Sequence, residues 1–328
     1  MLSLRRGTIT AVVERLDRLV RLEVDGLPCV AYPGLTGPVE EGDEVLVNVQ
    51  SRELGLGSGG FDVLYANLTR GLGLPAEEGA HVIKLPYTPL QAAVRHAEES
   101  APLAETLGGR PVVCCTLHSQ LAPVCAGLGT GLRVAYAQLP GGALPVSLSD
   151  AVRALKERGL LEVAAAVGAC VEGDVHCVST ASALAWAAGA GFDAVVCGIG
   201  PGIVGTHSAL GHGGLAAAEA ANAASALGGA PILAARVSEV DGRERHRGVS
   251  HHTRAALDLC LGRVVVAWPG GLARPAWLAE VAEEVDVTGW EEACSGLPLA
   301  HMGRGPADDP WFFASAFAAG RLAREFAG

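Results

Sequence analysis

Histidines, arginines and acids able to do chemistry gather in one stretch of the chain, residues 236–253. It contains four arginines, Asp241 and three histidines, His246, His251 and His252. Histidine and carboxylate ligands that come from different loops and leave one coordination position open suit a catalytic zinc or a similar divalent ion. The stretch therefore predicts a metal centre or a set of acid/base groups.

A glycine-rich stretch, residues 198–214, supplies two further histidines. Seven of its seventeen residues are glycine, which leaves the backbone free to curl and to approach a ligand closely. Because adjacent helical residues point about 100° apart, one of His251 and His252 is expected to face an ion without its neighbour. The predicted ligands of a zinc, manganese or iron ion are His207, His212, His246, His251 and His252.

Gly200, Gly202 and Gly205, followed by Thr206, predict an anion site. Their spacing fits a dinucleotide-binding turn and also a phosphate loop. The stretch lacks the lysine that a phosphate loop requires. The helix and the acidic residue that a dinucleotide-binding turn requires come too late in the chain. A nest of backbone amides that holds a phosphate or carboxylate is the remaining hypothesis, and tight packing alone is the alternative.

The arginines of the first stretch favour the same class of ligand. Guanidinium groups match the geometry of phosphate and carboxylate, so Arg243 and Arg245 are predicted anion ligands, with Arg247 beside them. A solvated network of ion pairs is the alternative for so charged a loop.

His118 follows another apolar strand and is expected to enter the same cleft if that strand neighbours the one before Gly198. The predicted catalytic groups are then His118, Asp241, His246 and His251. They predict an enzyme that acts on a small phosphate- or carboxylate-bearing metabolite, and a metal-bound water would make hydrolysis the natural reaction. The alternative is a non-catalytic nucleotide- or metabolite-binding protein whose histidines serve the structure.

The elements that must position these loops alternate between strand and helix after residue 111. This alternation predicts an α/β fold with a doubly wound, mainly parallel sheet, in which ligands bind at the carboxyl ends of the strands. Ser250 is the predicted N-cap of a helix over residues 251–261. A further helix is expected over residues 276–284.

Residues 7–48 follow a different pattern, of short alternating segments divided by turn residues such as Asp25 and Gly26. A period of two with turns at about ten-residue spacing predicts a small antiparallel β barrel or sandwich. With the boundary placed in the glycine-rich residues 51–79, we predict a β domain at residues 1–60 and an α/β ligand-binding domain at residues 61–328.

The composition restricts the class of protein. Half of the 328 residues are hydrophobic, but charged or amide residues interrupt the most apolar windows before the roughly 20 apolar residues that a membrane span requires. A formal charge of 24 − 35 = −11 and scattered arginines argue against a nucleic-acid partner. Nine cysteines without a Cys-x-x-Cys motif indicate a reducing compartment and hence the cytoplasm. A C-terminal helix is expected over residues 311–326. It packs either on the sheet or on a partner subunit, so a homodimer is one of two alternatives.

Two motifs together resemble those of a known family. They are Gly200-Pro-Gly-Ile-Val-Gly-Thr206 and Arg245-His-Arg-Gly-Val-Ser-His-His252, behind a β-rich N-terminal part. They are similar to an uncharacterised bacterial family known only as a domain of unknown function, over nearly the whole chain. The resemblance implies a shared fold and a shared site position, and it brings no activity and no catalytic residue.

Overall fold

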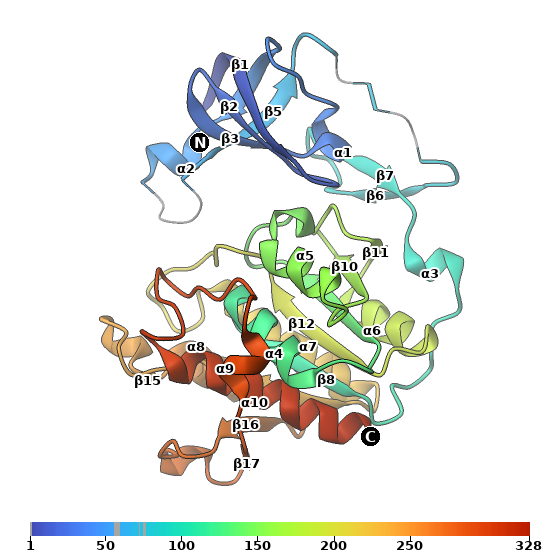
Figure 1. Ribbon diagram of the computed structural model, residues 1–328. Coiled ribbons are helices and arrows are strands. Elements are labelled where there is room, and N and C mark those ends of the chain that lie inside the picture. The colour runs from blue at the N-terminus through green and yellow to red at the C-terminus, as the bar shows by residue number, and fades with distance from the viewer. Residues whose placement is uncertain (1, 56–59, 72, 75–76) are drawn as a thin grey trace. The chain divides into compact units, whose positions relative to one another are not determined.

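A computed structural model describes residues 2–55, 60–71, 73–74 and 77–328 of the chain. The chain forms two compact units, Met1–Arg95 and His96–Gly328 (Figure 1). Among the described residues, no helix has both the length and the apolar character that crossing a bilayer demands.

The first unit is built around a closed barrel with the strand order β1-β2-β3-β5-β4. The strands are β1 (Leu4–Arg15), β2 (Val20–Val24), β3 (Leu27–Ala31), β4 (Glu44–Asn48) and β5 (Asp62–Asn67). In β2, Val20, Leu22 and Val24 are buried and the residues between them are half-buried, as the period of two requires. The predicted barrel is confirmed, with one parallel pair, β3 with β5, among antiparallel pairs.

The first unit continues beyond residue 60, where the sequence analysis placed the boundary. Strand β5 completes the barrel by pairing with β3 and β4, and a hairpin of β6 (Val82–Lys84) and β7 (Ala92–Val94) follows it. One-turn helices α1 (Pro33–Thr36) and α2 (Gln50–Glu53) belong to the same unit. Within the glycine-rich residues 51–79, positions 56–59, 72 and 75–76 lie outside the described residues.

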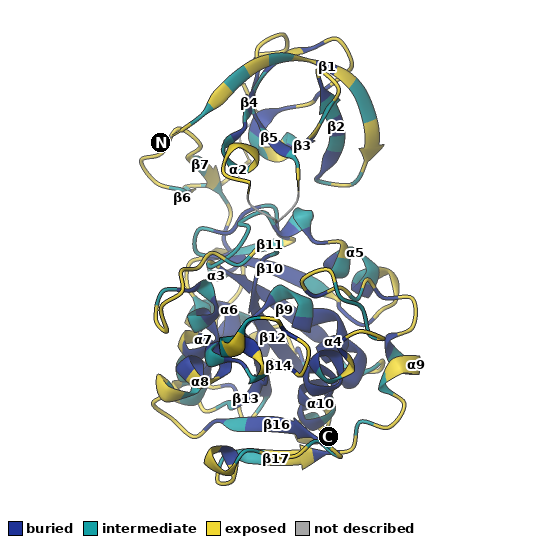
Figure 2. Cartoon of the chain, turned by 90° about the vertical axis from the view of Figure 1, so that its left-hand side faces the viewer, coloured by how far each residue is buried: buried dark blue, intermediate teal, exposed yellow. Residues whose placement is uncertain are grey.

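The second unit contains an eight-stranded parallel sheet, in the order β11-β10-β9-β12-β8-β13-β16-β17. Its strands are β8 (Pro111–Cys115), β9 (Val134–Leu139), β10 (Val163–Val167), β11 (Val175–Cys177), β12 (Ala194–Ile199), β13 (Ala230–Ala234), β16 (Val265–Pro269) and β17 (Ala282–Val285). Every residue of β9 and β12 is buried, and Figure 2 shows the central strands in dark blue. Burial on both faces explains why these strands are continuous apolar runs.

Two hydrophobic cores cover the two faces of this sheet. On β8, Val112 and Cys114 point into one core, and Val113 and Cys115 point into the other. The first core includes α6 (Thr180–Gly189), α7 (Ala216–Ala226) and α8 (His251–Asp258). The second includes α4 (Leu121–Leu128), α5 (Asp150–Glu157), α9 (Trp290–Cys294) and α10 (Pro310–Ala327). The predicted doubly wound α/β architecture is therefore confirmed.

The C-terminal helix α10 packs on this sheet and against α4. A Cβ on Gly320 would lie 1.9 Å from the carbonyl oxygen of Val124, and one on Gly127 would lie 2.3 Å from that of Phe317. The two helix backbones therefore meet at glycines, and most of the residues of α10 are buried within the chain.

The expected helix over residues 276–284 was wrong. The chain instead makes one short 3-10 helix, η5 (Ala276–Leu278), and then the edge strand β17. Glu283 and Glu284 are exposed in that strand, because an edge strand has a solvated side.

Loops from two strands meet above the carboxyl end of β8. The chain passes from β12 to β13 across β8, which lies between them in the sheet. A Cβ on Gly214, after β12, would lie 2.9 Å from the carbonyl oxygen of Thr116, which follows β8. Gln120 donates from Nε2 to the carbonyl oxygens of Ala234 at 3.0 Å and Ala235 at 3.2 Å, at the end of β13. Such a crossing of strand order is where α/β sheets bind ligands.

Candidate functional site

Four imidazole rings gather at this edge of the sheet. His212 lies in the loop after β12, His246 lies in the loop after β13, and His251 and His252 begin α8. The ring centroids of His212 and His252 are 3.9 Å apart, and that of His246 lies 4.8 Å from His251 and 4.9 Å from His252. We call these four residues the histidine cluster. It contains four of the five histidines predicted as metal ligands.

His251 and His252 lie together although they are neighbours in one helix, with ring centroids 4.5 Å apart. The predicted N-cap at Ser250 is confirmed. Its hydroxyl accepts a hydrogen bond from the His252 amide at 3.2 Å. Helical side chains lean toward the helix N-terminus, so both rings of this first turn project over the end of α8. The angle between adjacent helical residues therefore does not separate these two rings.

Three rings of the histidine cluster offer nitrogen atoms to one point. One nitrogen from each of His212, His251 and His252 lies within 4.8 Å of the other two. Within the described residues, both ring nitrogens of His212 and Nε2 of His251 are buried and make no hydrogen bond of ordinary geometry, although the backbone of Ala209 is near enough to His212 to raise its pKa. Three imidazoles with an open fourth position form a ligand set that zinc uses in enzymes.

Burial keeps these imidazoles neutral. Together with the nearby guanidinium of Arg236, it lowers the pKa of His246 to about 3 and the pKa of His252 to about 2. Burial is also the main reason that the pKa values of His212 and His251 are lowered. Because a metal ion binds the neutral imidazole, none of these rings has to lose an imidazolium proton at neutral pH before it binds one.

Arg236 determines the tautomer of His252. Its Nη1 lies 3.0 Å from Nδ1 of His252, and a guanidinium can only donate, so Nδ1 accepts and the ring proton is on Nε2. His252 would coordinate an ion only after Nε2 lost that proton or after Arg236 moved. His212 and Nε2 of His251 have no such restriction, so they are the stronger ligands.

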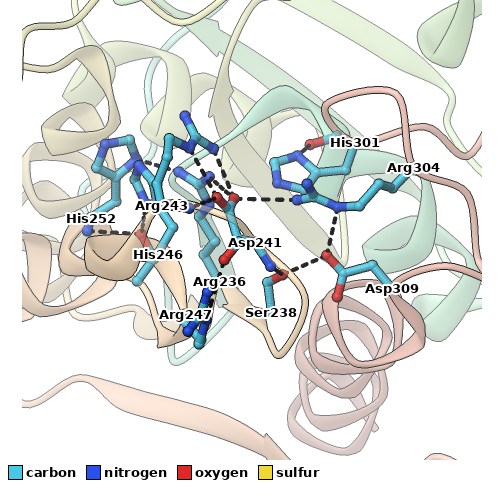
Figure 3. A network of polar contacts seen from close by, with 12 residues as sticks. Arg236, Ser238, Asp241, Arg243, His246, Arg247, His252, His301, Arg304 and Asp309 are labelled. Atoms are coloured by element: carbon cyan, nitrogen blue, oxygen red, sulfur yellow. Dashed lines mark hydrogen bonds and ion pairs between the residues drawn. The ribbon is translucent and has the colours of Figure 1, made fainter.

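Asp241 is the centre of an arginine network (Figure 3). Its Oδ2 lies 2.8 Å from Nη2 of Arg243, 3.2 Å from Nη2 of Arg304 and 3.6 Å from Nη2 of Arg236. Hydrogen bonds from Arg243, and then from Arg304, hold the pKa of Asp241 well below its usual range. The carboxylate is thus charged and bound by guanidinium groups, whereas the sequence predicted it as a catalytic group.

The network extends to the segment before α10. Nε of Arg304 lies 3.2 Å from Oδ2 of Asp309, which accepts a hydrogen bond from the Ser238 hydroxyl at 2.6 Å. Nδ1 of His301 lies 3.3 Å from the hydroxyl of Ser119, and burial lowers the pKa of His301 to about 3. The end of β8, the loop after β13 and the start of α10 therefore converge here.

The glycine loop packs backbone against backbone. A Cβ on Gly200 would lie 2.1 Å from the carbonyl oxygen of Ala143, and one on Gly213 would lie 2.0 Å from that of Gly141. The amide of Thr206 donates to the carbonyl of Gly211 at 2.7 Å. Contacts this close require glycine, so they support the packing interpretation at these positions.

Gly202 and Gly205 lie in the backbone segment that leads to His212. Gly202 has a φ of +69°, a conformation that glycine adopts readily. Gly205 forms an isolated antiparallel bridge with His212, and the amide of Gly213 donates to the carbonyl of Val204 at 2.8 Å. This small bridge holds the backbone that carries the His212 ring.

His118, His207 and Arg245 have other surroundings. His118 donates from Nδ1 to the Ile199 carbonyl at 3.2 Å, so its Nε2 accepts from the Ser149 hydroxyl at 2.8 Å. Burial lowers the pKa of His118 to about 4, and this satisfied ring links three loops. His207 is exposed, and Arg245 is half-buried with an unpartnered Nε.

Several residues of the site lie outside the set of functional residues predicted from the sequence. The place of Arg236 in the sequence indicates a site residue, because it follows a buried strand and therefore lies at the carboxyl edge of the sheet. His301, Arg304 and Asp309 stand in a turn-rich segment whose composition predicts only a loop. Their place beside the arginine network depends on how α10 packs.

Comparison with protein-family models matches residues 28–320 to a family described as "Protein of unknown function (DUF3866)". The match includes the whole histidine cluster and the arginine network. It confirms the resemblance to an uncharacterised family. No curated protein matches the chain.

Proposed function

We propose that this chain, which belongs to the DUF3866 family of proteins of unknown function, is a metal-dependent enzyme that hydrolyses a small anionic metabolite. The observation that carries the proposal is the convergence of ring nitrogens from His212, His251 and His252 within 4.8 Å of one another. Buried polar atoms without partners are rare in folded proteins, and they concentrate at binding sites.

The ligand set suits hydrolysis. A divalent ion held by imidazoles keeps a coordination position for water and lowers the pKa of that water to about 7. His246 is the adjacent imidazole, with Nδ1 2.7 Å from the Ser250 hydroxyl, and it stays neutral because burial lowers its pKa to about 3. With so low a pKa this imidazole is a weak base, so it can orient the reacting water by a hydrogen bond but does not hold a proton at neutral pH.

The charge around the cluster favours an anionic substrate. Arg236, Arg243 and Arg304 contact two carboxylates, Asp241 and Asp309, so the network carries 3 − 2 = +1 charge. Arg245 adds a further half-buried guanidinium from the same loop. A cation alone is repelled by these groups, whereas a cation with an anionic ligand is compatible with them.

Metal analysis of the untagged protein tests this proposal. The purified chain is dialysed against zinc, manganese or iron, freed of excess ion and analysed by plasma mass spectrometry. We expect one ion per chain, and we expect the double variant His212→Ala, His251→Ala to lose it. His207→Ala is the matched control, because His207 is exposed in the same loop. Equal metal content in the double variant and the control would refute the metal site.

A second candidate function is metal-free binding of an anionic metabolite. The contact between Arg236 and Nδ1 of His252 favours it, since that contact leaves an N–H on Nε2 and turns one ring into a donor. In that case dialysis would leave the chain without metal. Anionic metabolites would still raise the melting temperature of wild type, and they would raise it less in Arg236→Gln.

A further inference from the structure

Three guanidinium groups surround one carboxylate in the arginine network. The side chains of Asp241 and Arg236 are 2% and 3% exposed, whereas those of Arg304 and Arg243 are 22% and 36% exposed. The carboxylate therefore lies at the inner end of a group of arginines, two of which reach solvent.

The Asp241 carboxylate does not satisfy the donors around it. In the part of the chain that the structure describes, Nε of Arg236 and Nε2 of His301 are both buried without a hydrogen-bond partner. His301 is held in place by Phe312, with ring centroids 3.9 Å and planes 1° apart, and Figure 3 shows it beside Arg304. When the Ser119 hydroxyl donates to Nδ1 of His301, the neutral ring carries its proton on Nε2 and is a donor.

We propose that Arg236, Arg243 and Arg304 form a binding site for a phosphate group of the substrate, and that Asp241 occupies this site until the substrate displaces it. The proposal rests on the proposed function, whose substrate class it narrows. A phosphate dianion has more oxygen acceptors and one more charge than a carboxylate. It thus matches a site in which a carboxylate leaves guanidinium and imidazole donors unused.

The local structure allows the carboxylate to leave. The Asp241 amide donates to the Ser238 hydroxyl at 3.1 Å, a bond that a rotation of the Asp241 side chain does not break. A Cβ on the next residue, Gly242, would have no atom within 4 Å, while Nε of Arg247 lies 3.4 Å from the carbonyl oxygen of Asp241 and holds the backbone there. Displacement therefore requires a side-chain rotation that breaks the hydrogen bonds from the amide and guanidinium of Arg243 to the Asp241 carboxylate, and the incoming phosphate has to replace them.

The position of Arg236 indicates which part of the substrate binds there. Nη1 of Arg236 contacts His252, and its Nη2 faces Asp241, so its guanidinium stands between the histidine cluster and the proposed phosphate position. A phosphate at Asp241 is then an anchoring group, while the bond to be cleaved lies near the imidazoles. The expected substrate is a small molecule whose phosphate is separate from the reacting bond.

Calorimetric titration of inorganic phosphate into the chelator-treated full chain tests this inference, with acetate as the carboxylate probe. We expect phosphate to bind more tightly than acetate. Asp241→Asn is expected to bind phosphate at least about tenfold more tightly than wild type, because the internal competitor has lost its charge. Arg304→Gln is expected to bind it at least about tenfold more weakly, because one charge-assisted hydrogen bond is lost.

Arg254→Gln is the matched control, since Arg254 is an exposed residue of α8 whose guanidinium lies over the ring of Trp277. Its phosphate affinity is expected to equal that of wild type. Equal or weaker phosphate binding by folded Asp241→Asn would make Asp241 a scaffold for the arginines and overturn the proposal. If that variant does not fold, unchanged affinity in Arg304→Gln and Arg304→Lys overturns it instead.

The two proposals fail separately. Because the chelator removes any divalent ion, phosphate binding reports on the arginines alone, and metal content reports on the histidine cluster. If the chain binds phosphate but no metal, the anion site is supported and the metal-dependent reaction is refuted. If the chain binds metal, but phosphate binding does not depend on Arg304, the metal-dependent reaction is supported and the phosphate-bearing substrate class is refuted.

Discussion

Lowering the pH from 7 to 5 should destabilise the second unit, because three buried histidines remain neutral in the folded chain. His246, His252 and His301 are 2%, 6% and 4% exposed, and their pKa values are lowered to about 3, 2 and 3. In an unfolded chain an imidazole has a pKa of about 6.5, so the unfolded state takes up protons as the pH falls through that value. The contribution to stability is therefore complete above that pH and is lost below it.

Each of these histidines accounts for about 2 kcal/mol of the loss. The pH of 5 lies about 1.5 units below the unfolded pKa, and one unit corresponds to about 1.4 kcal/mol. The folded-state pKa values of His246, His252 and His301 are all below 5, so protonation of the folded chain offsets little. Independent titration gives these three a total of about 6 kcal/mol, and His118, whose pKa is lowered to about 4, adds about 2 kcal/mol more, which makes the loss comparable with the whole stability of a domain.

Asp241 does not contribute in this range of pH. Its pKa is lowered in the folded chain, so the stability that it provides is present above the unfolded carboxyl pKa of about 3.9 and is lost below it. The interval between pH 7 and 5 therefore reports on the histidines.

Urea unfolding of the chelator-treated protein at pH 7, 6 and 5, followed by tryptophan fluorescence, measures the effect. All five tryptophans belong to the second unit, namely Trp186, Trp268, Trp277, Trp290 and Trp311. His301→Gln should reduce the loss of unfolding free energy between pH 7 and 5 by about 2 kcal/mol. His207→Gln, at an exposed position, should leave it unchanged. Equal stability at pH 7 and 5, or the same loss in His301→Gln as in wild type, would refute the reasoning.

Two further predictions concern glycines. Gly320→Ala should lower the free energy of unfolding by about 1–3 kcal/mol, because its Cβ would lie 1.9 Å from the Val124 carbonyl oxygen in the contact of α10 with α4. Urea unfolding measures this, and Gly242→Ala, with open space around it, is the control. Gly200→Ala should lower the melting temperature, because its Cβ would lie 2.1 Å from the Ala143 carbonyl oxygen. An unchanged melting temperature with weaker phosphate binding would support an amide nest instead of packing.

The fold class was predictable from local pattern. The alternation of buried and half-buried residues in β2 and the continuous burial of β9 and β12 both follow from how strands present their faces. The helix cap at Ser250 was also predictable, because a hydroxyl before an N-terminus satisfies free amides. The strand β17 was missed because its exposed Glu283 and Glu284 resemble the polar face of a helix.

Part of the site was predictable as well. His212, His246, His251 and His252 all follow buried strands of the sheet, and the carboxyl ends of parallel strands share one edge. His118 follows such a strand too, yet it bonds to Ile199 and Ser149. A position after a strand thus predicts that a side chain lies near the carboxyl edge of the sheet. The path of its loop decides which residues it contacts there.

By itself the sequence determined the barrel, the parallel sheet, the glycine loop and the two stretches rich in histidine and arginine, because these depend on periodicity and turn residues close in the chain. Only the tertiary structure decided that Asp241 binds Arg304, 63 residues later, and that His301 stands beside them. The order of β12, β8 and β13 in the sheet brings the loops together, and the packing of α10 adds its N-terminal segment. Such contacts depend on burial and on strand order, and no local pattern encodes either.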